Sequence, residues 1–126
     1  PLLYLQKKQK KMLKQRVGLM ANNYKNSKVD LANTDVTTLY TAPAATQAIV
    51  KSLLVSNDSG SDDTITVTIT DSASAVFSVY KNEEVGALST KELLSQPLIV
   101  MESEIIKVTA ATGARLHVVA SYLEVT

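Results

Sequence analysis

Hydrophobic and polar residues alternate along most of the chain from residue 36 onward, and turn-forming residues divide this alternation into short segments. The clearest segment is TITVTITD, residues 64–71, in which isoleucine and valine alternate with threonine. A period of two places the apolar side chains on one face of a strand and the threonines on the other. Seven or eight such segments, at intervals of about ten residues, predict an all-β fold that forms a single β-sandwich.

The predicted strands cover residues 36–41, 47–56, 64–71, 75–81, 87–94, 98–101, 104–110 and 115–125. The alternation in 47–56 is expected to run unbroken, and residues 81–86 are expected to form a turn. Gly113 and Ala114 are expected to form the hairpin turn before the last strand. One face of that last strand is expected to carry Leu116, Val118, Ala120, Tyr122 and Glu124. The strand spacing is typical of an immunoglobulin-like or a jelly-roll-like sandwich and does not decide between them.

Residues near the start of the chain follow a helical period instead. Their apolar positions are spaced to share one face of a helix and comprise Leu2, Leu5, Met12, Leu13, Val17, Met20 and Tyr24. Asn22 and Asn23 are expected to end this helix, with polar residues from there to Asp35 leading into the sandwich. We therefore predict a basic amphipathic α-helical arm over residues 1–28, a linker over 29–35 and a β-sandwich domain over 36–126.

Charge is divided unevenly between the arm and the rest of the chain. The arm has no carboxylate and carries eight cations, Lys7, Lys8, Lys10, Lys11, Lys14, Arg16, Lys25 and Lys28. Residues 29–126 carry five cations and twelve carboxylates, a net charge of −7. Such a division is typical of an attachment arm joined to a folded body. The predicted docking residues are Leu5, Met12, Leu13, Val17, Met20 and Tyr24 together with Lys7, Lys8, Lys10, Lys11, Lys14 and Arg16.

Several partners for the arm remain open. The arm can dock on an acidic protein surface, with its apolar stripe filling a groove. It can instead be a solvated segment, or it can bind nucleic acid, for which Tyr4 and Tyr24 are its two residues able to stack on bases. A membrane-surface helix is disfavoured because the arm has no Trp or Phe.

Catalytic and metal-binding chemistry has little support in the sequence. The chain has one histidine and no cysteine, and His117 lies within a predicted strand without a nucleophile-elbow motif. The weak metal candidates are Asp58, Asp62 and Asp63, which surround Gly60 but lack the spacing and the closing glutamate of an EF-hand. Paired glutamates at 83–84 and at 102 and 104 are expected to be solvated. A non-enzymatic protein without cofactor or metal is predicted.

Four stretches resemble small β-sandwich proteins from the virions of tailed bacteriophages, especially marine phages and cyanophages. They are TTLYTAPAATQAIVKSLLVSNDSGSDDTITVTITD at 37–71, ELL at 92–94, IVMESEIIKVTA at 99–110 and LHVVASYLEV at 116–125. The resemblance implies a structural role as a capsid decoration or cement protein, or as a head, neck or tail accessory. It does not cover the arm.

Together these features predict a capsid decoration protein that its N-terminal helix attaches to the virion. A head–tail connector, neck or tail accessory protein is the alternative, and a nucleic-acid-binding protein is a further one. The expected partners are other virion proteins, either the major capsid protein or portal, neck and tail subunits, and further copies of this chain. Contact of the arm with DNA remains an alternative, and no membrane contact is expected. The expected location is the virion, assembled in the host cytoplasm.

Overall fold

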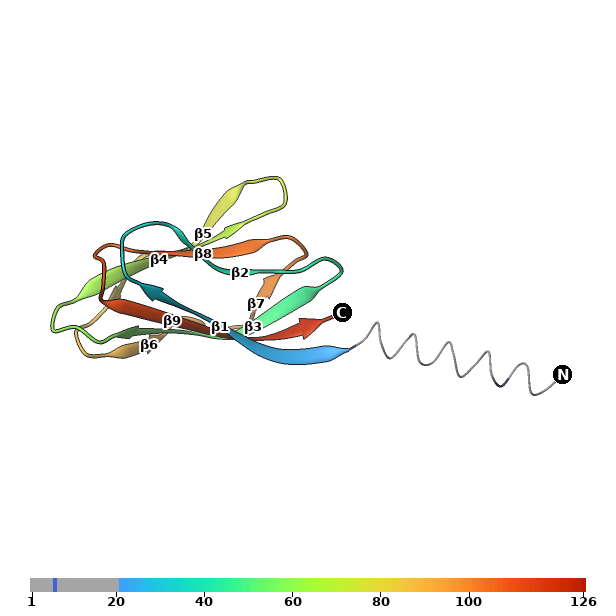
Figure 1. The fold of residues 1–126 in the computed structure, drawn as a ribbon, viewed down its shortest axis with the longest axis horizontal. Helices are drawn as coiled ribbons and strands as arrows, with labels where there is room; N and C mark the ends of the chain where they lie inside the picture. The colour runs from blue at the N-terminus through green and yellow to red at the C-terminus, as the bar shows by residue number, and fades with distance from the viewer. Residues whose placement is uncertain (1–5, 7–20) are drawn as a thin grey trace.

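The computed structural model describes Gln6 and residues 21–126, and this part of the chain contains nine β-strands (Figure 1). The strands are β1 (Asn22–Leu31), β2 (Thr37–Thr41), β3 (Gln47–Asn57), β4 (Asp63–Thr70), β5 (Val76–Val85), β6 (Thr90–Glu92), β7 (Leu98–Val100), β8 (Ile105–Ala110) and β9 (Leu116–Val125). The predicted all-β class is confirmed. The helical arm was predicted over residues 1–28. Residues 1–5 and 7–20 lie outside the described residues, and residues 22–28 belong to a strand instead of a helix.

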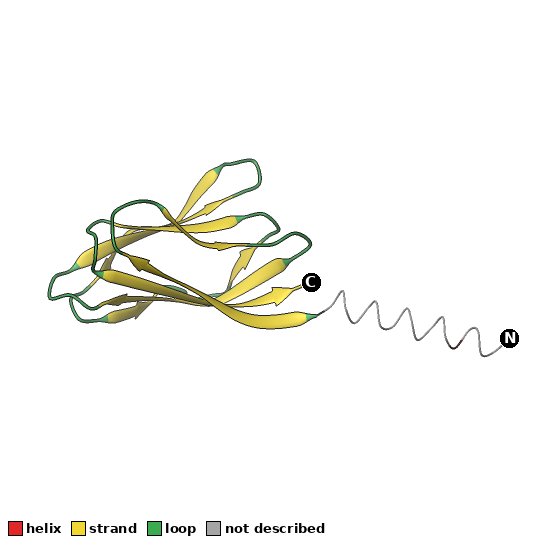
Figure 2. Cartoon of the chain, viewed as in Figure 1, coloured by secondary structure: helices red, strands yellow, loops and turns green. Residues whose placement is uncertain are grey.

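The strands form two antiparallel sheets that face each other as two layers (Figure 2). Sheet A has the order β1-β9-β3-β6, with β7 also paired to β3, and sheet B has the order β2-β8-β4-β5. Strands β6 and β7 occupy successive parts of one edge of β3, because β7 pairs with Ala48–Val50 and β6 pairs with Leu54–Ser56. These two short strands therefore share one position in the sheet.

The strand pairing identifies the fold as a jelly roll. Four pairs are nested as in one long hairpin: β1 with β9, β2 with β8, β3 with β6 and β7, and β4 with β5. Rolling this hairpin up adds the pairs β3·β9 and β4·β8, which close the two sheets. An immunoglobulin-like sandwich would pair strands A with B and D with E in one sheet. Among the long described strands, β4 and β5 are the one pair that is consecutive in the sequence and also directly hydrogen-bonded. This pattern does not fit the immunoglobulin-like alternative and fits the jelly roll.

The core lies between the sheets and is made almost entirely of aliphatic side chains. Sheet A contributes the expected inward face of β9, where alternate residues from Leu116 to Glu124 are buried. Sheet B contributes residues such as Ile65, Val67 and Val108, each with no exposed surface. At about 25 cal/mol per Å² of apolar area, this burial is the main favourable term that holds the two sheets together.

The unbroken alternation predicted for residues 47–56 is wrong. Ala48 and Val50 are buried, but the next buried residues are Leu53 and Val55, so the inward face changes its phase. The cause is an irregularity in the β3·β9 register between Val50 and Ser52, which makes Lys51 an extra, unpaired residue. A bulge of this kind exchanges the two faces of a strand.

The polar connection predicted to begin at residue 22 is also wrong. Asn22–Leu31 forms strand β1, and all ten of its residues pair with β9. From Ser27 the strand enters the sandwich, and alternate residues become more buried until Leu31 is 1% exposed. Pairing with β9 satisfies the backbone of this polar segment, which its side chains alone do not identify as a strand.

The turn predicted for residues 81–86 is wrong for most of its length, because β5 continues to Val85. The β4·β5 register is irregular between Ile65 and Val67, opposite this part of β5. Asn82 lies within it with a φ of 52°, in the left-handed region. The irregular backbone explains why the strand continues through a sequence that lacks alternation.

Gly113 is required for close packing rather than for a left-handed turn. The positive φ of 64° before β9 belongs to Ala114, while Gly113 lies against the backbone of Ala32 and Asn33. A Cβ atom at Gly113 would lie 2.7 Å from the carbonyl oxygen of Ala32. Backbone atoms cannot move aside as the end of a flexible side chain can.

We expect Gly113→Ala to lower the free energy of unfolding by about 1–3 kcal/mol, the usual effect of overpacking. Urea denaturation measures this change. Gly60→Ala is the matched control, because a Cβ atom there would have no neighbour within 4 Å. Equal stability of the two variants would contradict the close-packing role of Gly113.

Candidate docking site

Both ends of the folded part of the chain meet at one end of the sandwich (Figure 1). The backbone N–H and the hydroxyl of Thr126 both donate to the carbonyl oxygen of Ala21, at 3.0 and 3.2 Å. The loops 42–46 and 101–104 lie at the same end, since Ser103 N–H donates to the Ala42 carbonyl. We call this the basal end. Residues 1–20 join the sandwich here.

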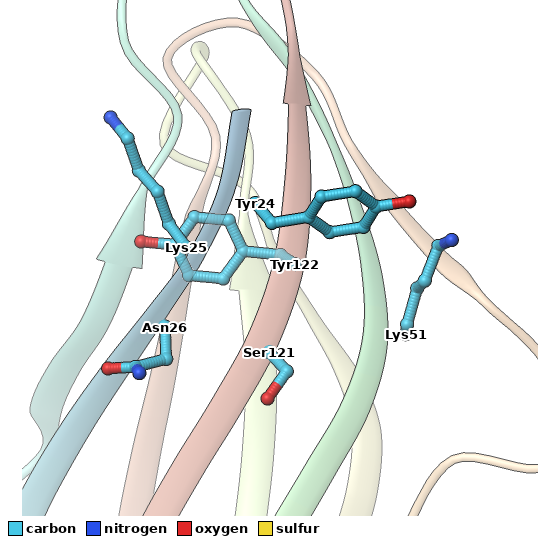
Figure 3. Close-up of a pocket in the computed structure, with 6 residues that line it drawn as sticks. All are labelled: Tyr24, Lys25, Asn26, Lys51, Ser121 and Tyr122. Atoms are coloured by element: carbon cyan, nitrogen blue, oxygen red, sulfur yellow. The ribbon is translucent and has the colours of Figure 1, made fainter. Parts of the chain in front are cut away.

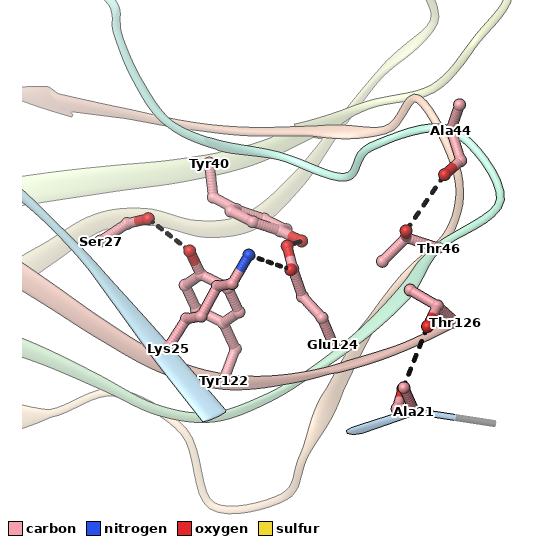
Figure 4. Close-up of polar contacts among 9 residues, drawn as sticks. All are labelled: Ala21, Lys25, Ser27, Tyr40, Ala44, Thr46, Tyr122, Glu124 and Thr126. Atoms are coloured by element: carbon pink, nitrogen blue, oxygen red, sulfur yellow. Dashed lines mark hydrogen bonds and ion pairs between the residues drawn. The ribbon is translucent and has the colours of Figure 1, made fainter. Parts of the chain in front are cut away.

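A buried carboxylate organises the basal end (Figure 4). Glu124 is 5% exposed and projects inward from β9. Its Oε2 atom accepts a hydrogen bond of 2.6 Å from the Tyr40 hydroxyl, and its Oε1 atom lies 2.7 Å from Lys25 Nζ. These partners come from β2 in sheet B and β1 in sheet A, so one carboxylate links both sheets.

The titration behaviour of this cluster follows from burial and pairing. Burial acts to raise the pKa of Glu124, but hydrogen bonds from Lys25 and Tyr40 outweigh it and hold that pKa below its ordinary value. Burial, together with the hydrogen bond to Glu124, raises the pKa of Tyr40 well above its ordinary range. The hydrogen bond with Glu124 also raises the pKa of Lys25. The cluster therefore holds one carboxylate and one ammonium group in their charged forms near neutral pH.

A second tyrosine completes the basal cluster. The rings of Tyr40 and Tyr122 have centroids 4.2 Å apart and planes tilted by 45°. The Tyr122 hydroxyl forms a hydrogen bond of 2.8 Å with the Ser27 hydroxyl, which lies on β1. The ring contact joins β2 of sheet B to β9 of sheet A, and the hydrogen bond to Ser27 ties β1 to the same cluster.

A shallow hollow of about 320 Å³ opens beside this cluster (Figure 3). Its lining residues are Tyr24, Lys25, Asn26, Lys51, Ser121 and Tyr122. Tyr24 is 75% exposed, and the ammonium of Lys51 lies 5.3 Å from the centroid of its ring. The cation is held over the aromatic face by a cation–π contact, and both groups face outward. Such a surface suits a partner that is acidic and partly apolar.

Acidic side chains gather at the opposite end, which we call the apical end. The loops 58–62, 86–89 and 111–115 lie there, because Leu88 N–H donates to the Ser59 carbonyl and Asp58 N–H to that of Arg115. The carboxylates in or next to these loops are those of Asp58, Asp62, Asp63, Glu83 and Glu84. Four other carboxylates, those of Asp71, Glu102, Glu104 and Glu124, lie at or near the basal end, so the described part of the chain carries acidic groups at both ends.

The weak metal candidates do not come together. The Asp58 carboxylate lies 3.8 Å from His117 Nδ1, whereas that of Asp62 accepts the Ala87 N–H at 2.8 Å. Asp63 is buried and accepts the backbone N–H groups of Thr64 and Thr112. Among the residues that the structure describes, no group of three or more His, Cys, Asp or Glu side chains is arranged to hold a metal ion.

Most of the predicted docking residues lie outside the described part of the chain. These are Leu5, Met12, Leu13, Val17, Met20, Lys7, Lys8, Lys10, Lys11, Lys14 and Arg16. Tyr24 is described, and it lies on the outer face of a strand rather than in the predicted helical stripe. Sequence reasoning missed the cluster of Lys25, Tyr40 and Glu124. The available signal was a carboxylate in the otherwise apolar inward series of the last strand.

No family model and no curated protein matches the chain. A structure of infectious bursal disease virus, Gx strain, is similar at 15% identity and a TM-score of 0.45. A structure of the Gt strain of the same virus is similar at 12% identity and a TM-score of 0.41. Each match covers 85% of this chain but 31% of the other chain. Within the described residues, no helix has the length and apolar character required to cross a membrane.

The lowered pKa of Glu124 sets a sign for the pH dependence of stability. As pH falls, the carboxyl group of Glu124 binds its proton in the unfolded chain before it does so in the folded chain. The charged carboxylate therefore contributes fully to the unfolding free energy above its ordinary pKa of about 4.3, and this contribution is lost as the pH falls below that value. We expect Glu124→Gln to be less stable than wild type near neutral pH, by roughly 1–3 kcal/mol, the size of a hydrogen bond to a charged group. This difference should shrink as the medium is acidified.

Urea denaturation at a series of pH values measures the effect. Glu102→Gln is the matched control, because Glu102 is exposed in a basal loop. If the difference in unfolding free energy between wild type and Glu124→Gln stayed the same at acidic pH, the role given to the charged carboxylate would be contradicted.

Proposed function

We propose that this chain is a non-enzymatic virion structural protein, a jelly-roll module that residues 1–20 and the basal end attach to another virion protein. One observation carries the proposal. The basic segment joins the sandwich beside the C-terminus, at Ala21, while the acidic loops lie at the far end. A module built in this way has one end for attachment and another for display.

The fold supports this proposal. Jelly rolls are common in viral capsid and lectin domains, but a fold does not by itself define a function. The sequence resemblance to phage virion proteins adds a second, independent reason. Among the resembling segments, TAPA at residues 41–44 forms part of the basal end, since Ala42 pairs with Glu104 and Ser103 there.

Within this class we propose capsid decoration, with the acidic apical end facing outward. Quantitative mass spectrometry of purified particles tests the assignment, because a decoration protein is present in many copies, whereas a connector, neck or tail protein is present in few. A low copy number would contradict decoration and favour the connector or tail alternative. Absence from the particles would contradict the virion role altogether.

The position of β1 defines the correct truncation for a test of attachment. Deleting residues 1–28 would remove most of β1 and with it Lys25, so loss of attachment could reflect unfolding. Deleting residues 1–20 leaves every strand intact. We expect that shorter deletion to give a folded β-rich protein, by circular dichroism and thermal melting, that no longer joins particles. Normal incorporation would contradict attachment through this segment.

A second variant separates apolar docking from charge attraction. Replacing Leu13, Val17 and Met20 with serine retains all eight cations. Weakened incorporation of this variant is expected if the apolar residues fill a groove on the partner. Attachment by charge alone, to nucleic acid or to protein, predicts no loss and a steep dependence on salt.

A further inference from the structure

The β4–β5 hairpin projects from the body of the sandwich (Figure 1). It carries exposed apolar residues. Val76 is 63% exposed, and Phe77, the only phenylalanine of the chain, is 58% exposed. Residues 72–80 contain no charged side chain. We call the segment around Val76 and Phe77 the hook. Val76 and Phe77 are consecutive residues of β5, so their side chains lie on opposite faces of the hairpin, and we take Phe77 as the contact residue of the hook. A large exposed apolar side chain without charged neighbours is typical of an interaction surface.

The tip of this hairpin is held in one conformation by its own hydrogen bonds. One carboxylate oxygen of Asp71 accepts the backbone N–H groups of Ala73 and Ala75, both at 2.9 Å. The Asp71 N–H also donates to the Ala75 carbonyl at 2.9 Å, and Ser74 has a φ of 66°. A segment that is already ordered loses less conformational entropy when it binds. The hook is therefore suited to docking without rearrangement.

A complementary apolar row crosses the outer face of sheet A. Leu123 pairs with Ile49, and Ile49 pairs with Ile99, so the three side chains lie side by side on β9, β3 and β7. Ile99 is 47% exposed and the other two are partly exposed. We call these three residues the ridge. The outer face of sheet B at the same level carries polar residues such as Thr68 and Lys107.

The hook and the ridge lie at the same level along the sandwich, near its basal end. The hairpin follows Thr70, which pairs with Ile105 directly after the basal loop 101–104. The ridge lies one outward row from the end of β9, where Val125 pairs with Asn22. The two features are on different sheets, so one copy of the chain cannot bring its own hook onto its own ridge.

We propose that the hook of one copy of this chain binds the ridge of the next copy. A rotation about an axis parallel to the long axis of the sandwich does not change the height of any atom along that axis. Two patches that such a rotation brings into contact must therefore lie at the same height. The hook and the ridge meet this condition. The contact is heterologous, because it joins two different surfaces, and it can repeat from copy to copy. Every basal end then points the same way, so that the segments 1–20 all emerge on one side of the assembly.

The chemistry of the two surfaces favours a second copy over other occupants. Phe77 of the hook meets the aliphatic side chains of the ridge, and no charged group of the hook has to lose its water. An acidic partner, which suits the hollow beside Lys51, gains nothing from the uncharged hook. The ridge adjoins the hollow at the basal end, because Leu123 pairs with Tyr24. Self-association is therefore measured on the isolated protein and attachment on particles, so that either proposal can fail while the other holds.

Sedimentation velocity of the full-length protein over a concentration series tests this association. Wild type is expected to form species larger than two copies of the 13.6 kDa chain. Phe77→Ser in the hook and Ile99→Ser in the ridge should each weaken the association by about thirtyfold, the effect of losing an interface hot spot. Leu88→Ser is the control, since Leu88 is 76% exposed at the apical end and should leave assembly unchanged.

Mixing the two variants identifies the heterologous geometry. The Phe77→Ser copy keeps its ridge and the Ile99→Ser copy keeps its hook, so an equimolar mixture should form a pair of twice the monomer mass. Formation of this pair also shows that both variants are folded. A monomeric wild type, a mixture that stays monomeric, or equal loss of assembly in Leu88→Ser would each overturn the proposal.

Discussion

Strand β9 is the element on which the rest of this structure depends. It pairs with β1 along ten residues and with β3 along ten residues, so it holds sheet A together from the centre. Its inward side chains run from Leu116 at the apical end to Glu124 at the basal end and supply much of the core. Because β9 ends the chain and β1 begins the fold, their pairing brings both ends of the sandwich sequence to one place. The location of the candidate docking site follows directly from this pairing.

The buried carboxylate of Glu124, at the end of β9, requires polar partners from two other strands. A buried carboxylate is costly unless it is paired and hydrogen-bonded, and here Lys25 and Tyr40 satisfy it. Lys25 therefore belongs to the folded body as much as to the basic segment that precedes it. The same cluster links sheet A to sheet B at the basal end, where the sandwich would otherwise be open. The carboxylate of Glu124 thus closes the core at the basal end, where the first and last strands of the sandwich meet.

The proposed attachment, display and self-association use different surfaces of one small scaffold. Ala21, to which the basic segment is joined, and the hollow beside Tyr24 and Lys51 lie at the basal end, whereas the loops that carry Asp58, Asp62 and Asp63 lie at the apical end. The hook lies on sheet B and the ridge lies on sheet A, where Leu123 of the ridge pairs with Tyr24 of the hollow. Strands hold these surfaces in fixed relation, which loops alone would not achieve. A repeating assembly requires such fixed geometry between copies.

Local alternation in the sequence determined the all-β class, the approximate strand positions and the inward face of β9, because a period of two depends only on neighbouring residues. It did not reveal β1, whose polar residues become a strand only through pairing with β9. Nor did it locate the bulge at Lys51, which shifts the buried face of β3. The choice of a jelly roll, the partners of Glu124 and the ridge across three strands were decided by the tertiary structure alone. All three features depend on contacts between residues that are far apart in the chain. The spacing of residues along the sequence does not indicate which strands become neighbours in the sheets.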